Sequence, residues 1–252
     1  MRTWIIGAIG AVMIGLGLLA STIAPAQAQD AALEDGSADR GAQLYAAGCQ
    51  TCHGPLGGGV QPWPGIAGAG EAAADFQLRT GRMPHTGGPD EQAQPKPPAY
   101  GEQEIRDLVA FVGSLGEGPA IPDVRTDPAL LQQGQQLFAV NCAPCHGSGG
   151  KGGAVGGGAI AWPLTNAGPV TVGEAMLSGP GQMPVFALPN EDLAAAATYV
   201  EYLRTAPDPG GFAIGGIGPV PEGFVAWLVG MGLLTIVVIG VGRSWDSKDG
   251  TS

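Results

Sequence analysis

The sequence predicts an all-α protein built from two similar domains in tandem, followed by one C-terminal transmembrane helix. Three observations support this prediction. Residues near the start of the chain recur later with the same types in the same order, which indicates an internal repeat. No stretch shows the alternation of apolar and polar residues that is typical of a strand. Near the C-terminus, an uncharged apolar run at residues 224–242 is long enough to cross a bilayer as one helix.

The repeat is clearest between residues 40–49 and residues 133–142. The two segments align without a gap and share a glycine, a glutamine, a leucine, an aromatic residue, an alanine and a cysteine. Further on, a Gly-x-Met-Pro sequence ends at Pro84 in one copy and at Pro184 in the other. Each copy therefore predicts the same order: a helix, a cysteine cluster, a glycine-rich loop, a short helix, a Met-Pro loop and a final helix.

Capping residues predict where several of these helices begin. Ser37 is expected to cap the first helix of the first copy, and Asp127, followed by a proline, that of the second copy. Thr171 and Glu174 have the spacing of a capping box for the short helix of the second copy. Asn190 is expected to cap the final helix of that copy.

The domain boundaries follow from the repeat and from two connections rich in Gly and Pro. They are a signal peptide or N-terminal anchor, 1–28; the first domain, 37–116; a linker, 117–127; the second domain, 128–205; a tether, 206–222; the transmembrane helix, 223–242; and a cytoplasmic tail, 243–252.

The two apolar segments predict the same orientation in the cell membrane. Residues 4–20 are apolar and are followed by an A-x-A pattern that ends at Ala28, which is typical of a cleaved secretory signal. Because Arg2 is the only charge before this run, an uncleaved anchor is the alternative. Arg243 and Lys248 follow the C-terminal run, so the positive-inside rule places the C-terminus in the cytoplasm and both domains on the extracytoplasmic side.

The chain of 252 residues has 11 Lys and Arg against 22 Asp and Glu, a formal net charge of −11. This balance excludes a nucleic-acid partner, because neutralising phosphates requires clustered basic side chains. An acidic surface could steer a basic partner or simply keep the protein soluble. With 45 glycines, 22 prolines and only 6% aromatic residues, the side-chain core should be thin, so another group is expected to fill part of it.

All 4 cysteines fall in two clusters, each followed directly by a histidine: Cys49, Cys52 and His53, and Cys142, Cys145 and His146. The spacing C-x-x-C-H is the attachment signature of c-type haem. The two thiols bond to the vinyl groups of the porphyrin, and the adjacent imidazole binds the iron. The sequence therefore predicts two covalently bound haem c groups, whose apolar rings would complete the two thin cores.

Zinc, a redox dithiol and disulfides are the other uses of paired cysteines. A zinc site would pool ligands from both clusters in one compact fold, whereas each cluster here begins a domain of its own. A thioredoxin-like dithiol expects a βαβ setting, which the sequence lacks. Disulfides give no role to the histidine after each pair. Only covalent haem uses every residue of both clusters.

The sixth position of each iron needs a second axial ligand. Once the two cluster histidines are used, only His85 remains, so the second haem cannot have two histidine ligands. Met183 is its predicted ligand because it lies in the Met-Pro loop, while the rival Met176 lies in a helical pattern and is expected in the core. For the first haem, Met83 and His85 could both reach the iron, and the symmetry of the repeat favours Met83.

Other residues are expected to support the haems. The second nitrogen of each iron-binding imidazole needs a hydrogen-bond acceptor, for which backbone carbonyls near Pro64 and Pro163 are candidates. Trp63 and Trp162 precede these prolines and are expected either to line the haem or simply to pack. Glycines in both glycine-rich loops are expected to let the backbone pass close to the ring.

An iron held by an imidazole and a thioether has no open position and a raised reduction potential. Such a protein transfers single electrons, and no substrate chemistry is expected on this chain alone. The alternatives are a dihaem electron-transfer subunit of another dehydrogenase or oxidase, and a dihaem peroxidase, which would need one haem to open its sixth position. A redox sensor is disfavoured because the short tail holds no signalling domain.

The two haem motifs, the Gly-x-Met-Pro loops, the single C-terminal span and the sequence at residues 215–223 before it resemble one known family. This family is the dihaem cytochrome c subunit of the actinobacterial menaquinol:cytochrome c reductase, the cytochrome bcc complex. The resemblance covers nearly the whole mature chain and implies two tandem class I cytochrome c domains. Its axial ligands carry over as His53 with Met83 and His146 with Met183.

The resemblance also implies the partners. These are a cytochrome b subunit, a Rieske iron-sulfur subunit and a haem-copper oxidase, besides the membrane lipid. The domain of Cys49 would accept electrons from the Rieske protein, and the domain of Cys142 would pass them to the copper centre of the oxidase. The chain would thus belong to an enzyme only as the electron-transfer subunit of a quinol:cytochrome c reductase. Residues 86–100, a longer loop than its counterpart, are expected to face a partner subunit.

Overall fold

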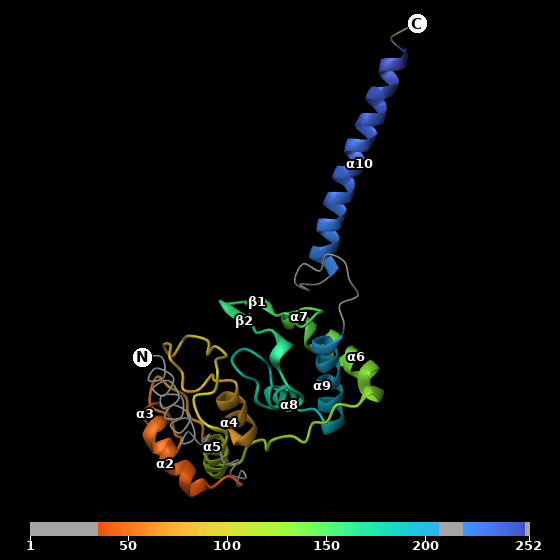
Figure 1. Ribbon diagram of the computed structural model, residues 1–252. Helices are drawn as coiled ribbons and strands as arrows, with labels where there is room; N and C mark the ends of the chain where they lie inside the picture. Colours follow the sequence, from red (N-terminus) through yellow and green to blue (C-terminus); the bar gives the residue numbers. More distant parts are fainter. Residues whose placement is uncertain (1–34, 207–218, 250–252) are drawn as a thin grey trace, which may run out of the picture. The chain divides into compact units, whose positions relative to one another are not determined.

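The computed structural model describes residues 35–206 and 219–249 (Figure 1). The predicted signal peptide or anchor at 1–28, most of the predicted tether and the end of the predicted tail lie outside the described residues. Within the described part, one set of helices is followed by a second set in the same order, and then by a single long helix.

The first set comprises α2 (Ala38–Gly48), α3 (Gln50–His53), α4 (Gly70–Arg79) and α5 (Glu102–Ser114). The second comprises the 3-10 helix η2 (Pro128–Leu130), α6 (Leu131–Asn141), α7 (Ala143–His146), the strands β1 (Gly153–Gly156) and β2 (Ala159–Ala161), the 3-10 helix η3 (Leu164–Asn166), α8 (Pro169–Ser178) and α9 (Asn190–Thr205). The order of helices is the one that the repeat predicts. The predicted fold class is confirmed.

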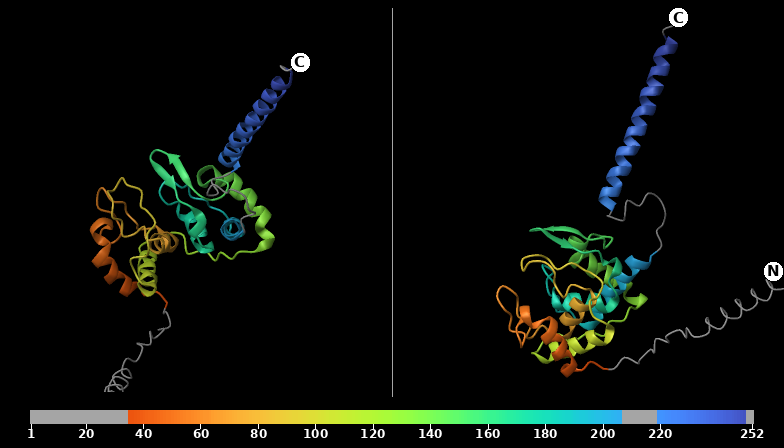
Figure 2. Two further views of the ribbon diagram at one scale, coloured as in Figure 1. Left: turned by 45° about the horizontal axis from the view of Figure 1, so that its top comes forward. Right: turned by 60° about the vertical axis from the view of Figure 1, so that its left-hand side comes forward.

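The strands β1 and β2 are a local departure from an all-α chain (Figures 1 and 2). They form an antiparallel hairpin in which Gly153 pairs with Ala161 and Ala154 with Ile160. The hairpin lies within the glycine-rich loop of the second domain and is the only sheet among the residues described. Strands this short and rich in glycine show no alternating pattern, which is why the sequence did not reveal them.

The helix starts confirm part of the capping prediction. Ser37 caps α2 by accepting a hydrogen bond from the backbone N–H of Arg40 at 3.4 Å. Asp127 accepts one from the backbone N–H of Ala129 at 2.9 Å, and the turn η2 that it begins continues directly into α6.

Two capping predictions are wrong. Helix α8 begins at Pro169 with Gly168 as its cap, so Thr171 already lies inside the helix and makes no capping box with Glu174. A proline at the first helical position starts the helix earlier, because its fixed φ suits the first turn. Asn190 is the first residue of α9 and does not cap it; the cap position belongs to Pro189.

In each domain the first helix crosses the last one at a glycine of the repeat. A Cβ atom on Gly41 would lie 1.9 Å from the carbonyl oxygen of Asp107 in α5, and one on Gly134 would lie 2.0 Å from that of Ala195 in α9. Only glycine allows two helix backbones to approach this closely. The sequence showed these glycines as part of the repeat but not their role.

A tilted aromatic pair packs beside each crossing. The rings of Tyr45 and Phe111 lie 5.0 Å apart in the first domain, and those of Phe138 and Tyr199 lie 5.2 Å apart in the second. Pairs in this range contribute on the order of 1 kcal/mol beyond the area they bury. The crossing and its aromatic pair therefore form one unit that both domains repeat.

The two domains contact each other through equivalent helices, α4 and α8. A second contact comes from the long loop of the first domain. The side-chain amide of Gln92 donates to the backbone carbonyl of Ile160 at 2.8 Å, and its oxygen accepts from the N–H of the same residue at 2.9 Å. This part of the loop thus binds the second domain of the same chain, and the expected contact of 86–100 with a partner subunit stays a prediction.

Helix α10 (Pro219–Asp249) is a single uninterrupted helix (Figure 1). Residues Gly223–Arg243 are long and apolar enough to cross a membrane, and none of this surface is buried by the protein itself. Large apolar side chains are exposed along it, among them Leu233 at 61% and Ile236 at 68%. An exposed stripe of this size requires lipid or protein to cover it. The helix continues past both ends of the predicted span of 223–242.

Candidate haem-binding sites

Each cysteine cluster forms a single helical turn, α3 in the first domain and α7 in the second. The backbone N–H of His53 donates to the carbonyl of Cys49 at 3.0 Å, and that of His146 donates to the carbonyl of Cys142 at 2.8 Å. Side chains three and four residues apart lie on one face of such a turn. Both thiols and the imidazole of each cluster are therefore positioned by the same few backbone bonds.

Backbone carbonyls orient the two imidazoles in the same way. Nδ1 of His53 lies 2.9 Å from the carbonyl oxygen of Pro64, and Nδ1 of His146 lies 3.0 Å from that of Trp162. A carbonyl can only accept, so Nδ1 carries the hydrogen, and Nε2 keeps its lone pair free for a metal. The predicted acceptors are confirmed, with the second one at the residue before Pro163.

The glycine after each histidine turns the chain back over the cluster. Gly54 and Gly147 have φ of 75° and 73°, in the left-handed region where a side chain is strained. The returning loop then donates to the carbonyls of the two histidines, from the N–H of Gly59 and of Gly152, both at 2.8 Å. This bond closes each glycine-rich loop onto its cluster.

The glycines at these loop closures are required by the backbone itself. A Cβ on Gly59 would lie 2.6 Å from the nitrogen of Gly65, and a Cβ on Gly152 would lie 2.2 Å from the carbonyl oxygen of Ala161. Their predicted approach to a haem ring stays a prediction, but the close contacts within the chain already exclude other residues.

The state of the thiols disfavours the alternatives to haem. No disulfide joins any of the four cysteines. Burial raises the pKa of Cys142 to about 11 and also raises that of Cys49, whereas a redox dithiol needs a lowered pKa. Across residues 35–206 and 219–249, no group of three or more His, Cys, Asp or Glu side chains could hold a metal ion such as zinc.

Each predicted methionine ligand packs against the same core as a cysteine of its cluster. Met83 and Cys49 both contact the first core, and Met183 and Cys142 both contact the second. Met176 is only 4% exposed within α8 and belongs to the second core, where the sequence placed it.

His85 is engaged elsewhere. Its Nε2 lies 3.0 Å from the carbonyl oxygen of Gly88, and its ring stands edge-on to Trp63 with the centroids 6.0 Å apart. A carbonyl partner requires the hydrogen on Nε2, so this nitrogen cannot bind iron in the observed arrangement. Nδ1 of His85 keeps its lone pair, so the choice of Met83 over His85 as the second ligand of the first domain stays a prediction.

Comparison with known proteins identifies the family. A family model for cytochrome c matches residues 38–116, and one for cytochrome c oxidase, cbb3-type, subunit III matches residues 129–200. The cytochrome bc1 complex cytochrome c subunit of Mycobacterium leprae is 38% identical over 229 residues, which cover 85% of this chain and 79% of the relative. The subunit of the same name from Corynebacterium efficiens is 34% identical over 268 residues, covering 96% and 90%. The chain belongs to this family of cytochrome c subunits.

A more distant relative matches a smaller share of the chain. The FixP subunit of a cbb3-type cytochrome c oxidase from Sinorhizobium medicae is 28% identical over 129 residues, which cover 48% of this chain and 42% of that protein.

The two cytochrome c domains of the chain carry two covalently bound haem c groups, and the protein is an electron-transfer cytochrome.

Residues of this dihaem subunit fit the propionate groups of haem. Nε1 of Trp162 is buried and has no hydrogen-bond partner among the described residues, so it can donate to a carboxylate that enters the site. In the first domain, Arg82 lies over the ring of Phe76 at 4.7 Å, and burial lowers its pKa. A half-buried guanidinium beside Met83 would be stabilised by a negative group, which a propionate would supply when haem is bound.

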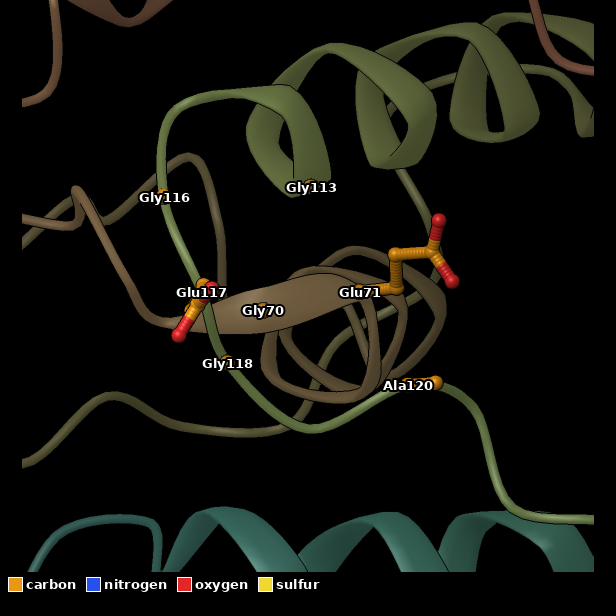
Figure 3. A pocket seen from close by; sticks show the side chains of 7 residues that line it. All are labelled: Gly70, Glu71, Gly113, Gly116, Glu117, Gly118 and Ala120. Carbon is orange, nitrogen blue, oxygen red and sulfur yellow. The ribbon is translucent and has the colours of Figure 1, made fainter.

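A shallow pocket on the first domain is distinct from these sites (Figure 3). Glycine backbone from α4, α5 and the linker forms most of its lining, together with Glu71, Glu117 and Ala120. The lining includes none of the cluster or Met-Pro loop residues.

Proposed function

We propose that this cytochrome c subunit transfers single electrons from a Rieske iron-sulfur protein to a haem-copper terminal oxidase, as part of a quinol-oxidising cytochrome bcc complex. The observation that carries the proposal is the presence of two sites of the same design in one chain. In each, a carbonyl holds a histidine so that Nε2 is free, and a methionine packs on the same core as a cysteine of the cluster.

His53 with Met83 and His146 with Met183 are the proposed axial ligands. When bound with these two ligands, haem c exchanges one electron and has no open coordination position. The two carbonyl bonds keep both imidazoles in one tautomer, and the packed methionines keep the sixth position closed. This closed design argues against the alternative of a dihaem peroxidase, which needs room for peroxide at one iron.

The order of the two sites is proposed from the family resemblance. The first domain accepts the electron from the Rieske protein, and the second delivers it to the oxidase. With a net charge of −11, the chain can attract a basic docking surface on a partner. Helix α10 holds both domains at the membrane, and Arg243 near its end favours an extracytoplasmic position for them.

Optical spectra of the full-length, haem-loaded protein test the ligands. Met83→Ala and Met183→Ala should each remove half of the sulfur-to-iron charge-transfer band and lower one of the two reduction potentials by about 0.1 V or more, within the roughly 0.8 V over which axial ligands set haem potentials. The matched controls His85→Ala and Met176→Leu should leave the band intact. Loss of the band in His85→Ala, with its survival in Met83→Ala, would reverse the assignment.

Purification from membranes tests the assembly. A cytochrome b, a Rieske protein and a haem-copper oxidase should copurify with the tagged chain in mild detergent. Copurification with a dehydrogenase instead would favour another electron-transfer assembly. A high-spin haem spectrum together with peroxide turnover by the isolated chain would favour the peroxidase.

A further inference from the structure

Glu174 is a buried acid at the contact between the two haem domains. It lies in α8, which packs against α4 of the first domain, and only 1% of its surface is exposed. Neither of its carboxyl oxygens has a hydrogen-bond donor in the described part of the chain. An ionised carboxylate in such a place is strongly disfavoured, because nothing replaces the water that it loses.

The group that faces Glu174 across this contact is a second acid, Asp75 of α4. Asp75 is 3% exposed, and Nε of Arg79 donates to both of its oxygens, at 2.8 and 2.7 Å. The other nitrogens of Arg79 bind Glu102 of α5. The guanidinium is therefore fully engaged on the side of the first domain, and Asp75 is the acid of the pair that it binds.

The repeat explains why two acids meet. Asp75 is the sixth residue of α4 and Glu174 is the sixth residue of α8. The position of Arg79, at the end of α4, is taken in α8 by Ser178, whose hydroxyl bonds to the backbone carbonyl of Glu174. The two domains thus dock through one position of the repeat, but only the first copy has a cation beside its acid.

Two carboxylates cannot bond to each other, because both only accept hydrogen bonds. One proton removes the conflict, since a protonated acid donates. Burial, together with the neighbouring Asp75, raises the pKa of Glu174 to about 9, although Arg79 opposes this shift. The proton therefore resides on Glu174 at neutral pH.

We infer that Glu174 carries a proton and donates it to Asp75, and that this hydrogen bond is a pH-sensitive contact that docks the second haem domain on the first. Glu174 is then a positioning residue for electron transfer between the two domains, a consequence that rests on the proposed function. The docking itself does not depend on which protein supplies or removes the electron.

The charged groups of the linker and of α9, which also pack against α8, have other partners or face solvent. In the linker, whose Pro122 and Val124 pack against α8, Asp123 and Arg125 form an exposed ion pair. In α9, the side chain of Asp192 accepts from Gln133, Glu201 pairs with Arg204, and Glu191 is exposed. The loop after α8, residues 179–189, contains no titratable side chain.

The direction of the pH effect follows from proton linkage. In undocked domains Glu174 would be exposed and titrate near its ordinary pKa of 4.5, whereas in the docked pair its pKa is about 9. Its contribution to docking is therefore complete below pH 4.5 and is lost as the pH rises toward 9. Between these values each pH unit should weaken docking by up to about tenfold.

The bond between Gln92 and Ile160 provides a matched control. It joins the same two domains but contains no titratable group. Gln92→Ala should weaken docking by a similar factor at every pH. Glu174→Gln should instead keep docking strong and remove its pH dependence, because the amide N–H₂ donates to Asp75 at any pH.

Two measurements on the full-length, reduced, haem-loaded protein in detergent test the inference. The infrared C=O stretching band of a protonated carboxyl should be present at neutral pH, disappear near pH 9 and be missing from Glu174→Gln. Hydrogen exchange in α4 and α8, corrected for intrinsic rates and compared with α2 and α6, should accelerate between about pH 6 and about pH 8 in the wild type only.

Absence of the carboxyl band in the wild type would overturn the inference. So would a wild-type exchange profile that does not change with pH, and neither result requires a variant that folds. An equal pH dependence in Glu174→Gln would also contradict it. If the chain serves other electron donors or acceptors than proposed, the band and the exchange profile remain as expected, so the two hypotheses fail separately.

Discussion

The two haem domains share their haem-binding design but support it with different chemistry. Arg40 and Gln133 occupy the same place in the repeat, directly before the glycine of the helix crossing. Arg40 binds the buried carboxylate of Asp107 through two nitrogens, at 2.8 and 3.0 Å, while the amide of Gln133 donates to Asp192 at 2.7 Å. An ion pair therefore stabilises the helix crossing in the first domain, whereas a hydrogen bond from a neutral amide stabilises it in the second.

The copies also differ where they touch. The first domain has a long loop with Gln92, and the second has the hairpin whose strand β2 receives it. At the α4–α8 contact, one acid has an arginine and the other has a serine at the corresponding position. Features shared by the copies orient the haem ligands, and features that differ join the copies to each other.

Removing one haem should produce the largest effect and shows whether the domains are independent. Cys142→Ser with Cys145→Ser should halve the covalent haem content, measured by haem staining and by haem per polypeptide. The second domain should also lose its fold, since its core is thin without the ring. Cys49→Ser with Cys52→Ser is the matched change in the first domain. Loss of both haems from either variant would contradict independent sites.

An added methyl group at each helix crossing tests whether the crossings are equivalent. Gly41→Ala and Gly134→Ala place a Cβ 1.9 and 2.0 Å from a backbone oxygen, so the helices must move apart. Each should lower the free energy of unfolding by about 1–3 kcal/mol, measured by chemical denaturation of the domain concerned. Gly88→Ala, where the added Cβ meets only the carboxyl group of Glu91, at 3.4 Å or more, is the control outside both glycine-rich loops. A loss of unfolding free energy in only one of the two domains would show that the crossings are not equivalent.

Removing the support beside each crossing should have a smaller effect. Asp107→Asn should destabilise the first domain by about 2 kcal/mol, because it weakens a charge-assisted bond, and Gln133→Ala the second by about 1 kcal/mol. Arg40 and the backbone N–H of Ser37 hold the pKa of Asp107 at about 2, below its ordinary 3.8. The bond therefore stabilises the fold above pH 3.8 and is lost as the pH falls through about 2.

Denaturation at several pH values checks this difference between the domains. The difference in free energy of unfolding between wild type and Asp107→Asn should shrink as the pH falls from about 4 to about 2. The loss of unfolding free energy caused by Gln133→Ala should stay nearly constant over the same range. If the difference between wild type and Asp107→Asn does not change over this pH range, the ionised carboxylate does not stabilise the crossing.

The sequence alone predicts the haem clusters, the helix order and the membrane helix, because the sequence patterns of these features involve residues that are close together in the chain. A cluster such as Cys49, Cys52 and His53 fits within one helical turn, so its spacing alone places the groups on one face. The same holds for the cap at Ser37. The capping box at Thr171 and Glu174 failed because Pro169 offered an earlier start for the same helix.

The amino-acid sequence by itself determined that two haems bind covalently, what the order of the helices is, and that one helix is apolar enough to cross a membrane. Only the tertiary structure decided that Gly41 and Gly134 lie at helix crossings, that Gln92 binds Ile160, and that Glu174 is buried opposite Asp75. The physical reason is distance along the chain: these contacts join residues far apart in sequence, and periodicity and spacing carry information only about near neighbours.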